Sequence, residues 1–463
     1  MIALRSRLRP PLVAALILLP PLAAGARADP ACLASPKRDC AFAWALAAAR
    51  ADRTHAALRI GALMYVAAGL AQAGRSAEAA AVFEEVRAAG TALPSPGSAD
   101  DTLAMLAGGQ ARAGLFEGAR TTARGIADGQ ARAKAFSEIA AALVERGRFE
   151  DAVATARAIE IFAGRSDALV AVGRALAEAG RIEEALAAAR AIPEDIQRLR
   201  VLHKVADLLA RERRPEADAI LREGIALARR LSGESEQAIF VGQFAGVLAR
   251  LGRDGEAMAL ADSIARPELR HSALGPIASA QAETGRIDAA LATLKLIDAR
   301  NRDRDNPVFA RTAAMRDIVR ALAKAGRLDE AAAIAATMRS ANDYRHVALR
   351  AVALAYAGAG RFEQAIAYAR SIGSGERDYV LRALVPVLVE AGRFDDALAI
   401  GRSLAQGYER APAIAAVGAG FWKADRKPAA EAAFREALSA AEALPEGLFR
   451  SEALVKIALL LPR

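Results

Sequence analysis

The side chains that most often perform catalysis or bind metal ions are sparse in this 463-residue sequence. No two histidines lie close enough in the sequence to share a helical turn, and no set of cysteine ligands accompanies them. No phosphate-binding glycine loop and no Gly-x-Ser-x-Gly turn is present. The histidines are His55, His203, His271 and His346. The sequence therefore predicts a protein that is not an enzyme and that needs no cofactor and no metal ion.

Arginine, by contrast, recurs at a regular spacing near the starts of expected helices. A cation at a helix start opposes the helix dipole, so each copy needs a compensating partner. We favour a structural role, in which the guanidinium donates to the carbonyl end of the preceding helix or pairs with an acid such as Glu376 or Glu409. The alternative is a series of sites for an acidic ligand. We call these residues the arginine ladder: Arg59, Arg132, Arg165, Arg198, Arg270, Arg311, Arg345, Arg377, Arg410 and Arg450.

The elements that position these arginines are helical hairpins, and residues 166–195 show the unit most clearly. Leu169, Val172 and Leu176 lie three and four residues apart, so they share one face of a first helix. Gly180 follows the last apolar turn, where a helix commonly ends in a left-handed residue. A shorter second helix then starts with acids in its first turn, which the helix dipole favours.

The Gly-Arg turn recurs along the chain, mostly 32 to 34 residues apart, and a fixed period of this size indicates a repeat array. Three connections, at 90–98, 231–235 and 298–306, are longer, and they predict longer second helices with looser loops. The other turn glycines are Gly74, Gly114, Gly147, Gly252, Gly285, Gly326, Gly360 and Gly392, with Arg213 and Asp425 at the same place in degenerate copies. The predicted fold class is all-α, a right-handed α-solenoid of about 11 antiparallel helix-turn-helix repeats.

These repeats resemble the tetratricopeptide repeat (TPR) family over roughly residues 41–463. The family pattern has a large residue, a large–small pair and another large residue on the first helix, then a glycine turn and a small residue on the second helix. Here these places hold Leu169, Val172-Gly173, Leu176, Gly180 and Ala185. The sequence departs from the family in having Leu, Ile or Ala at most of its aromatic positions, and in its short second helices.

The resemblance implies a scaffold that binds protein or peptide segments in the groove lined by its first helices. The groove positions of the C-terminal half are basic and would suit acidic peptides or anionic envelope polymers. The alternative is an ordinary solvated face. The C-terminal set is Arg316, Arg320, Arg350, Tyr379 and Arg382. The N-terminal set is mixed: Asp167, Arg174, Arg200, His203 and Asp207.

Residues 1–28 have the features of a secretory signal, with a basic start, an apolar stretch and an Ala-x-Ala site that predicts cleavage after Ala28. The apolar stretch is shorter than the roughly 20 residues of a membrane span, so no stable span is expected after cleavage. The signal carries four arginines and no acid, which lowers the net charge from +9 to +5 in the mature chain. We therefore expect a periplasmic or secreted protein. Its arginines are interleaved with acids, so no nucleic-acid partner is expected.

The only two cysteines, Cys32 and Cys40, follow the predicted cleavage site closely. Because an exported protein meets an oxidising compartment, we expect a disulfide between them. Residues 45–50 match a second helix of the unit, so the first repeat lacks its first helix. We expect residues 29–40 to replace that helix as a disulfide-stapled cap, and residues 448–460 to form a lone first helix that caps the far end of the array over 41–463.

Taken together, the repeats and the signal favour a non-enzymatic protein- or peptide-binding scaffold of the bacterial periplasm, with the shape of a curved, elongated particle. The alternative function is a cell-envelope enzyme, or a solenoid that binds polysaccharide or peptidoglycan.

Overall fold

The computed structural model describes residues 30–462 except 52–54, 298–306, 339–343 and 406–408. The expected signal over 1–28 lies outside the described residues. Within the described ranges the chain forms 25 α-helices and no strand, which confirms the all-α solenoid class. Long first helices alternate with second helices that are mostly much shorter, so the repeating unit is the predicted helical hairpin.

The first helices are α3 (Ala56–Gln72), α5 (Pro96–Arg112), α7 (Gly129–Glu145), α9 (Phe162–Glu178), α11 (Asp195–Arg211), α13 (Glu234–Arg250), α15 (Pro267–Glu283), α17 (Pro307–Lys324), α19 (Tyr344–Gly358), α21 (Ser374–Glu390), α23 (Arg410–Lys423) and α25 (Leu448–Leu460). The second helices are α2 (Arg38–Ala51), α4 (Ser76–Thr91), α6 (Phe116–Arg124), α8 (Phe149–Arg157), α10 (Ile182–Arg190), α12 (Ala217–Ala228), α14 (Asp254–Asp262), α16 (Ile287–Leu296), α18 (Leu328–Thr337), α20 (Phe362–Ser371), α22 (Phe394–Ser403) and α24 (Lys427–Glu442). A short helix, α1 (Pro30–Ala34), precedes them.

The turn inside each hairpin depends on a left-handed residue, as predicted. Gly180 has φ +76°, and the next amide, of Arg181, donates to the carbonyl of Leu176 at 2.9 Å. The other predicted turn glycines also have positive φ. Arg213 (φ +55°) and Asp425 (φ +57°) adopt the same conformation without glycine. For a residue with a side chain this conformation is strained, so the hairpin packing must hold these two turns in place.

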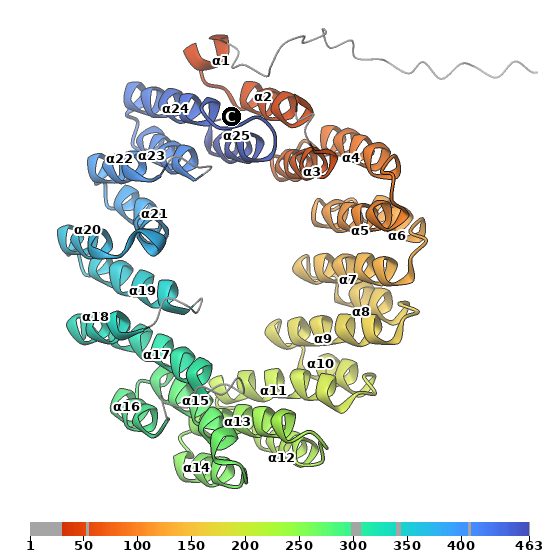
Figure 1. The fold of residues 1–463 in the computed structure, drawn as a ribbon, viewed down its shortest axis with the longest axis vertical. Helices are drawn as coiled ribbons and strands as arrows, with labels where there is room; N and C mark the ends of the chain where they lie inside the picture. The colour runs from red at the N-terminus through yellow and green to blue at the C-terminus, as the bar shows by residue number, and fades with distance from the viewer. Residues whose placement is uncertain (1–29, 52–54, 298–306, 339–343, 406–408, 463) are drawn as a thin grey trace, which may run out of the picture.

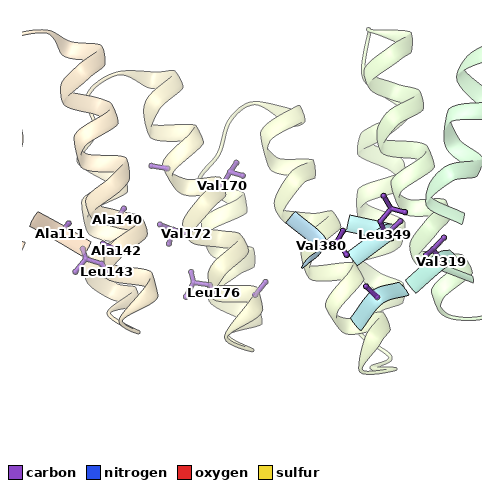
Figure 2. Close-up of a cluster of buried hydrophobic side chains, with 14 of the residues drawn as sticks. Ala111, Ala140, Ala142, Leu143, Val170, Val172, Leu176, Val319, Leu349 and Val380 are labelled. Carbon is purple, nitrogen blue, oxygen red and sulfur yellow. The ribbon is translucent and has the colours of Figure 1, made fainter. Parts of the chain in front are cut away.

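The core is a continuous layer of aliphatic side chains between neighbouring helices. Leu143, Val172 and Leu176, visible in Figure 2, are fully buried, and they come from successive first helices. The alanine five residues after each turn glycine, such as Ala185, is also fully buried, because the two helices of a hairpin approach closely there. Each repeat therefore buries its apolar face mainly against its neighbours.

The long connections have different outcomes. The first two do extend the second helix, since α4 has 16 residues and α12 has 12, against nine in α6, α8 and α10. For the third connection, the predicted lengthening of the second helix is wrong, because α16 has only ten residues. The connection after it, 298–306, lies outside the described residues.

The repeats form a closed ring, with first helices inside and second helices outside (Figure 1). The ends of the array meet, because the C-terminal helix α25 packs between α2 and α3 and against α23 and α24. Helices α25 and α2 thus form a twelfth hairpin whose two halves come from opposite ends of the chain. The expected curved, elongated particle is wrong, because the lone first helix and the lone second helix pack together and close the ring.

The contacts at this junction, which we call the seam, are those of an ordinary repeat. Ser451 of α25 is fully buried and donates from its hydroxyl to the carbonyl of Ala45 in α2 at 3.1 Å. The Arg38 guanidinium at the start of α2 donates to the carbonyl of Leu461 at 2.6 Å. On the other side, a Cβ added at Gly69 of α3 would lie 2.3 Å from Val455, so the missing side chain lets α25 and α3 approach.

The structure changes the roles expected for both ends. The predicted Cys32–Cys40 disulfide is present and joins α1 to α2. However, within the predicted cap over 29–40, the described residues 30–40 do not replace the missing first helix, since α25 occupies that place and α1 lies against α24 instead. Residues 448–460 form a helix as predicted, but it completes the first repeat and leaves no exposed end to cap.

Candidate binding surface inside the ring

Three of the five predicted C-terminal groove residues form one cluster on the inner helices α19 and α21. The Cζ of Arg350 lies 5.2 Å from the ring centroid of Tyr379, and the Cζ of Arg382 lies 5.9 Å from it. The ring of His346 meets Tyr379 edge-on, with 4.6 Å between centroids. Two cations against one aromatic ring gain cation–π stabilisation and hold the tyrosine in a fixed position.

The other two predicted residues lie one repeat earlier, on α17. Arg316 pairs with both carboxylate oxygens of Asp317 at 2.7 Å and lies over the ring of Tyr344, with its Cζ 4.5 Å from the centroid. Asp317 is 4 % exposed, and its hydrogen bond raises the pKa of the Arg316 guanidinium. The Arg320 side chain is 60 % exposed, and its distance of 3.9 Å to Asp317 is long for an ion pair. Its charge is therefore largely available to solvent.

Positive charge exceeds negative charge along this part of the inner face. Arg382 pairs with Glu409 at 2.7 Å. Arg350 has no carboxylate partner among the residues that the structure describes, and neither has the exposed Lys324. Arg320, Lys324 and four alanines of α17 and α19 also line a pocket of about 890 Å³, which Arg211 and Glu283 border from other inner helices. We call the cationic and aromatic side chains of this surface the basic strip: Arg316, Arg320, Lys324, Arg350, Tyr379 and Arg382.

The N-terminal groove residues do not gather into a comparable surface. Asp167 accepts a hydrogen bond from the Gln197 amide at 2.8 Å, so it is already engaged. His203 is packed edge-on against Phe244, with 5.8 Å between ring centroids. Burial lowers the pKa of His203 to about 4, which makes it neutral near pH 7. Asp207 belongs to an ion-pair cluster that the sequence did not reveal.

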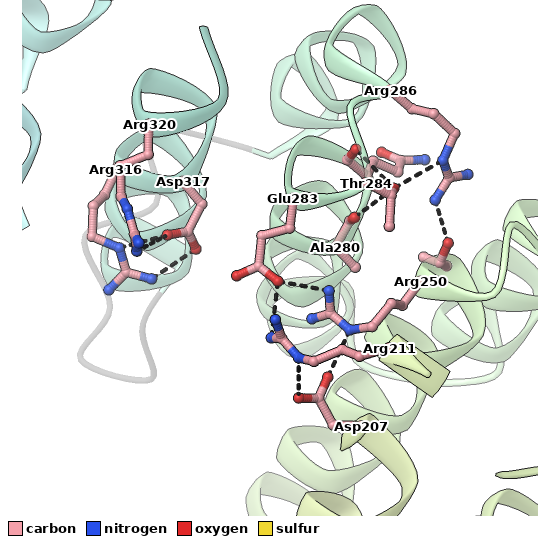
Figure 3. A network of polar contacts seen from close by, with 12 residues as sticks. Asp207, Arg211, Arg250, Ala280, Glu283, Thr284, Arg286, Arg316, Asp317 and Arg320 are labelled. Carbon is pink, nitrogen blue, oxygen red and sulfur yellow. Dashed lines mark hydrogen bonds and ion pairs between the residues drawn. The ribbon is translucent and has the colours of Figure 1, made fainter. Parts of the chain in front are cut away.

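This cluster joins three inner helices (Figure 3). Arg250 of α13 donates to Asp207 of α11 at 2.7 Å and to Glu283 of α15 at 2.6 Å, and Arg211 of α11 donates to the same two acids at 2.9 and 3.0 Å. Burial alone would raise the pKa of the Asp207 carboxyl, but Arg250 and Arg211 outweigh it and hold that pKa below its ordinary value. We call these four residues the inner ion-pair cluster.

The close packing of α13 and α15 explains how Glu283 reaches Arg211 across two repeats. A Cβ added at Gly242 would lie 2.8 Å from the Cα of Ala273, and one at Gly246 would lie 2.9 Å from Pro276. Without side chains at these places the helix backbones can nearly touch, and helices on either side of α13 come within reach of one another. Two glycines four residues apart in one first helix were the available sequence signal.

The structural interpretation of the arginine ladder is confirmed for four of its members. Each donates to a backbone carbonyl six residues earlier, at the end of the preceding second helix. The donor–acceptor distances are 2.9 Å for Arg132 to Ile126, 3.1 Å for Arg198 to Ile192, 3.1 Å for Arg270 to Ile264 and 2.9 Å for Arg450 to Leu444. Arg345 pairs instead with Glu376, the acid expected near the ladder.

A second series of arginines, in the Gly-Arg turns, was missed as an interacting set. Arg181 donates to Glu184 at 2.6 Å within its own repeat and to Glu150 of the previous repeat at 2.5 Å. Arg393 makes the equivalent bonds to Asp396 and Glu363, both at 2.6 Å. The acids at second-helix starts therefore engage the turn arginines and couple successive repeats on their turn side.

The described residues contain neither a metal-binding cluster nor a membrane-spanning helix. No group of three or more His, Cys, Asp or Glu side chains there could hold a metal ion. None of the helices in these ranges is both long and apolar enough to cross a membrane.

Comparisons with known proteins find only solved structures of low similarity. No protein-family model and no curated protein matches the sequence. Among solved structures, Ton1535 from Thermococcus onnurineus NA1 is similar over 70 % of this chain and 98 % of its own, with 17 % identity and a TM-score of 0.31. The APC/C hetero-tetramer Cut9–Hcn1 is similar over 89 % and 85 %, with 14 % identity and a TM-score of 0.28. A circular tandem repeat protein is similar over 87 % and 84 %, with 13 % identity and a TM-score of 0.13.

With every TM-score below 0.5, these likenesses carry no argument about this chain. The chain's own hairpins, with their glycine turns and buried alanines, define a TPR-like helical-repeat protein.

Proposed function

We propose that this protein is a non-enzymatic scaffold that holds an acidic segment of a partner protein against the inner face of the ring. The basic strip is the observation that carries the proposal. Its cations outnumber the nearby carboxylates, and Arg350 and Lys324 have no acidic partner among the described residues. Such cations can pair with a partner's carboxylates without first breaking an existing ion pair.

The geometry also favours an extended segment. The strip runs over α17, α19 and α21, three neighbouring inner helices, so a bound chain would cross successive repeats. Tyr379 is partly exposed between two arginines and offers a fixed aromatic surface for an apolar side chain of the partner. The pocket beside Arg320 and Lys324 would take a further side chain over its alanine floor.

The location proposed for this activity is the periplasm or the cell exterior. The predicted signal over 1–28, with cleavage after Ala28, would direct export. The Cys32–Cys40 disulfide is compatible with an oxidising compartment, where such bonds persist.

The first test measures binding of a 20-residue glutamate-rich peptide by fluorescence anisotropy. Affinity should fall as salt rises, because exposed charge pairs are screened beyond about 10 Å at 0.1 M. Replacing Arg350 and Arg382 by Ala should weaken binding roughly three- to tenfold, since exposed ion pairs contribute up to about 1 kcal/mol each. Thermal stability should change little, because both side chains are partly exposed.

Arg345 and Arg377 provide the matched control, since they lie on the same two helices. Arg345 makes a largely buried pair with Glu376, so replacing Arg345 and Arg377 by Ala should lower stability and leave peptide affinity unchanged. If instead the Arg350/Arg382 variant loses stability and the Arg345/Arg377 variant loses binding, the binding role and the structural role have been assigned to the wrong arginine pairs.

The second test asks what the inner face contacts in the native envelope. A photo-crosslinking residue at exposed Arg320 should capture an acidic protein, whereas the same residue at exposed Arg435 on the outer helix α24 should not. Capture of peptidoglycan or another polysaccharide at Arg320, with no affinity for the acidic peptide, would replace the proposal by a polysaccharide-binding or envelope-enzyme function.

A further inference from the structure

The seam lies inside the α25–α2 hairpin, and it is the one junction of the described ring that no stretch of the chain crosses. Every other hairpin is joined to the next by a connecting segment, so parting two such repeats leaves them tethered. At the seam, α25 meets α2 and α3 only through side-chain packing and hydrogen bonds. Because repeats mainly contact their neighbours, separation at the seam would leave the remaining interfaces intact.

One element reinforces the seam from outside. Helix α1 lies against α24, on one side of the seam, while the Cys32–Cys40 disulfide joins α1 to α2, on the other side. Cys32 is 2 % exposed, so its side chain is part of the packed interior and not a loose attachment. Helix α1 is therefore a strap from α24 to α2. Residues 35–37 connect it to α2 along the chain, and the disulfide holds it in a fixed position against α2, so that it stays packed on α24.

We propose that the ring opens at the seam to admit a partner protein to its inner face, and that the Cys32–Cys40 disulfide is the latch that restrains this opening. The proposal rests on the proposed function, since it concerns how a partner reaches the basic strip. A segment with a free end can enter a closed ring along its axis. A segment with folded domains at both ends needs a lateral opening.

The latch would be released by a dithiol, through ordinary thiol–disulfide exchange. Cys40 is the more accessible sulfur, so a dithiol thiolate attacks Cys40 Sγ, the Cys32–Cys40 bond breaks and Cys32 leaves as a thiolate. The second thiolate of the dithiol then attacks the mixed disulfide and releases Cys40. Two electrons pass to the protein, the dithiol becomes a cyclic disulfide, and the two cysteine thiolates take up protons from solvent.

The expected effect follows from the shortness of the closed loop. The two cysteines are eight residues apart. Closing a loop of this size reduces the number of conformations available to the chain by a factor of about 50 to 100. Reduction should therefore raise the equilibrium constant for seam opening by up to this factor. In hydrogen exchange, amides of α25 and α2 should lose protection on reduction, while those of α9 and α10, far round the ring, should not.

The functional experiment compares two probes. One is the 20-residue glutamate-rich peptide with free ends, and the other is the same peptide with a folded domain fused to each end. Each is added to the oxidised ring, to the ring reduced with dithiothreitol, and to a ring cyclised by a split intein that joins residues 29 and 463. We expect the free-ended peptide to bind all three forms, and the two-domain probe to bind the reduced ring at least tenfold faster than the oxidised ring and the cyclised ring not at all.

Each outcome decides between the ideas. Capture of the two-domain probe by the cyclised ring as fast as by the reduced ring would overturn the proposed opening at the seam. If the free-ended peptide binds no form, the basic strip is not the binding surface. Hydrogen exchange then tests by itself whether reduction of the disulfide opens the seam. Faster exchange of α25 and α2 in the reduced protein and in a Cys32→Ser, Cys40→Ser variant supports it. Unchanged exchange there, or loss of protection confined to α1, refutes the latch.

Discussion

Replacement of Arg250 by Ala is the sharpest test of the inner ion-pair cluster. Its side chain is only 10 % exposed and bridges Asp207 and Glu283, which are 15 % and 32 % exposed. Removing one partner of a fully buried pair costs about 3–5 kcal/mol, because the other charge is left without compensation. Both acids keep Arg211 and some solvent, so we expect a loss of about 2–3 kcal/mol in local stability.

Hydrogen exchange is the suitable assay, because a repeat protein opens locally and a single unfolding midpoint would average over the ring. A loss of 2–3 kcal/mol corresponds to a fall of roughly 30- to 160-fold in the protection of amides in α11, α13 and α15. The matched control is Arg211→Ala, in the same cluster but 47 % exposed, which should cost less than about 1 kcal/mol.

Arg250→Lys adds a second control. It keeps the charge but lacks the planar fork that reaches two carboxylates, so its effect should fall between those of Arg250→Ala and wild type. If Arg250→Ala costs no more than Arg211→Ala, burial does not decide the strength of this cluster, and the reasoning fails.

Three further predictions concern titration, turns and the seam. The folded-state pKa of His203, about 4, lies below its unfolded value near 6.5, so protonation favours unfolding. Stability should fall from pH 6.5 toward pH 4, by about 2 kcal/mol at pH 5, and His203→Gln should flatten this part of a denaturation–pH profile. Arg213→Gly should raise the urea midpoint by relieving a positive φ, with a gain of up to about 1 kcal/mol, whereas Gly180→Ala should lower it. Ser451→Ala removes a buried hydrogen bond to α2 and should speed exchange in α25 and α2 by about tenfold, with no change in α9.

Local features of the chain were readable from the sequence because each depends on a few neighbouring residues. The turn at Gly180 needs only a residue that tolerates positive φ, and the buried place of Ala185 follows from its distance to that turn. The Cys32–Cys40 bond joins residues close in the chain. The resemblance to the TPR family likewise placed Arg350, Tyr379 and Arg382 on one surface, where the structure brings them into contact.

The closure of the ring was beyond this kind of reasoning. The sequence shows a second helix without a first helix at one end and a first helix without a second helix at the other. Whether they meet depends on the small rotation between successive repeats, summed over the whole array. The total rotation is set by side-chain packing at every interface, such as the contact of Gly246 with Pro276. It therefore cannot be read from the sequence of any single repeat. The same packing brings Glu283 to Arg211, two repeats away, so tertiary structure alone decided both the seam and the inner ion-pair cluster.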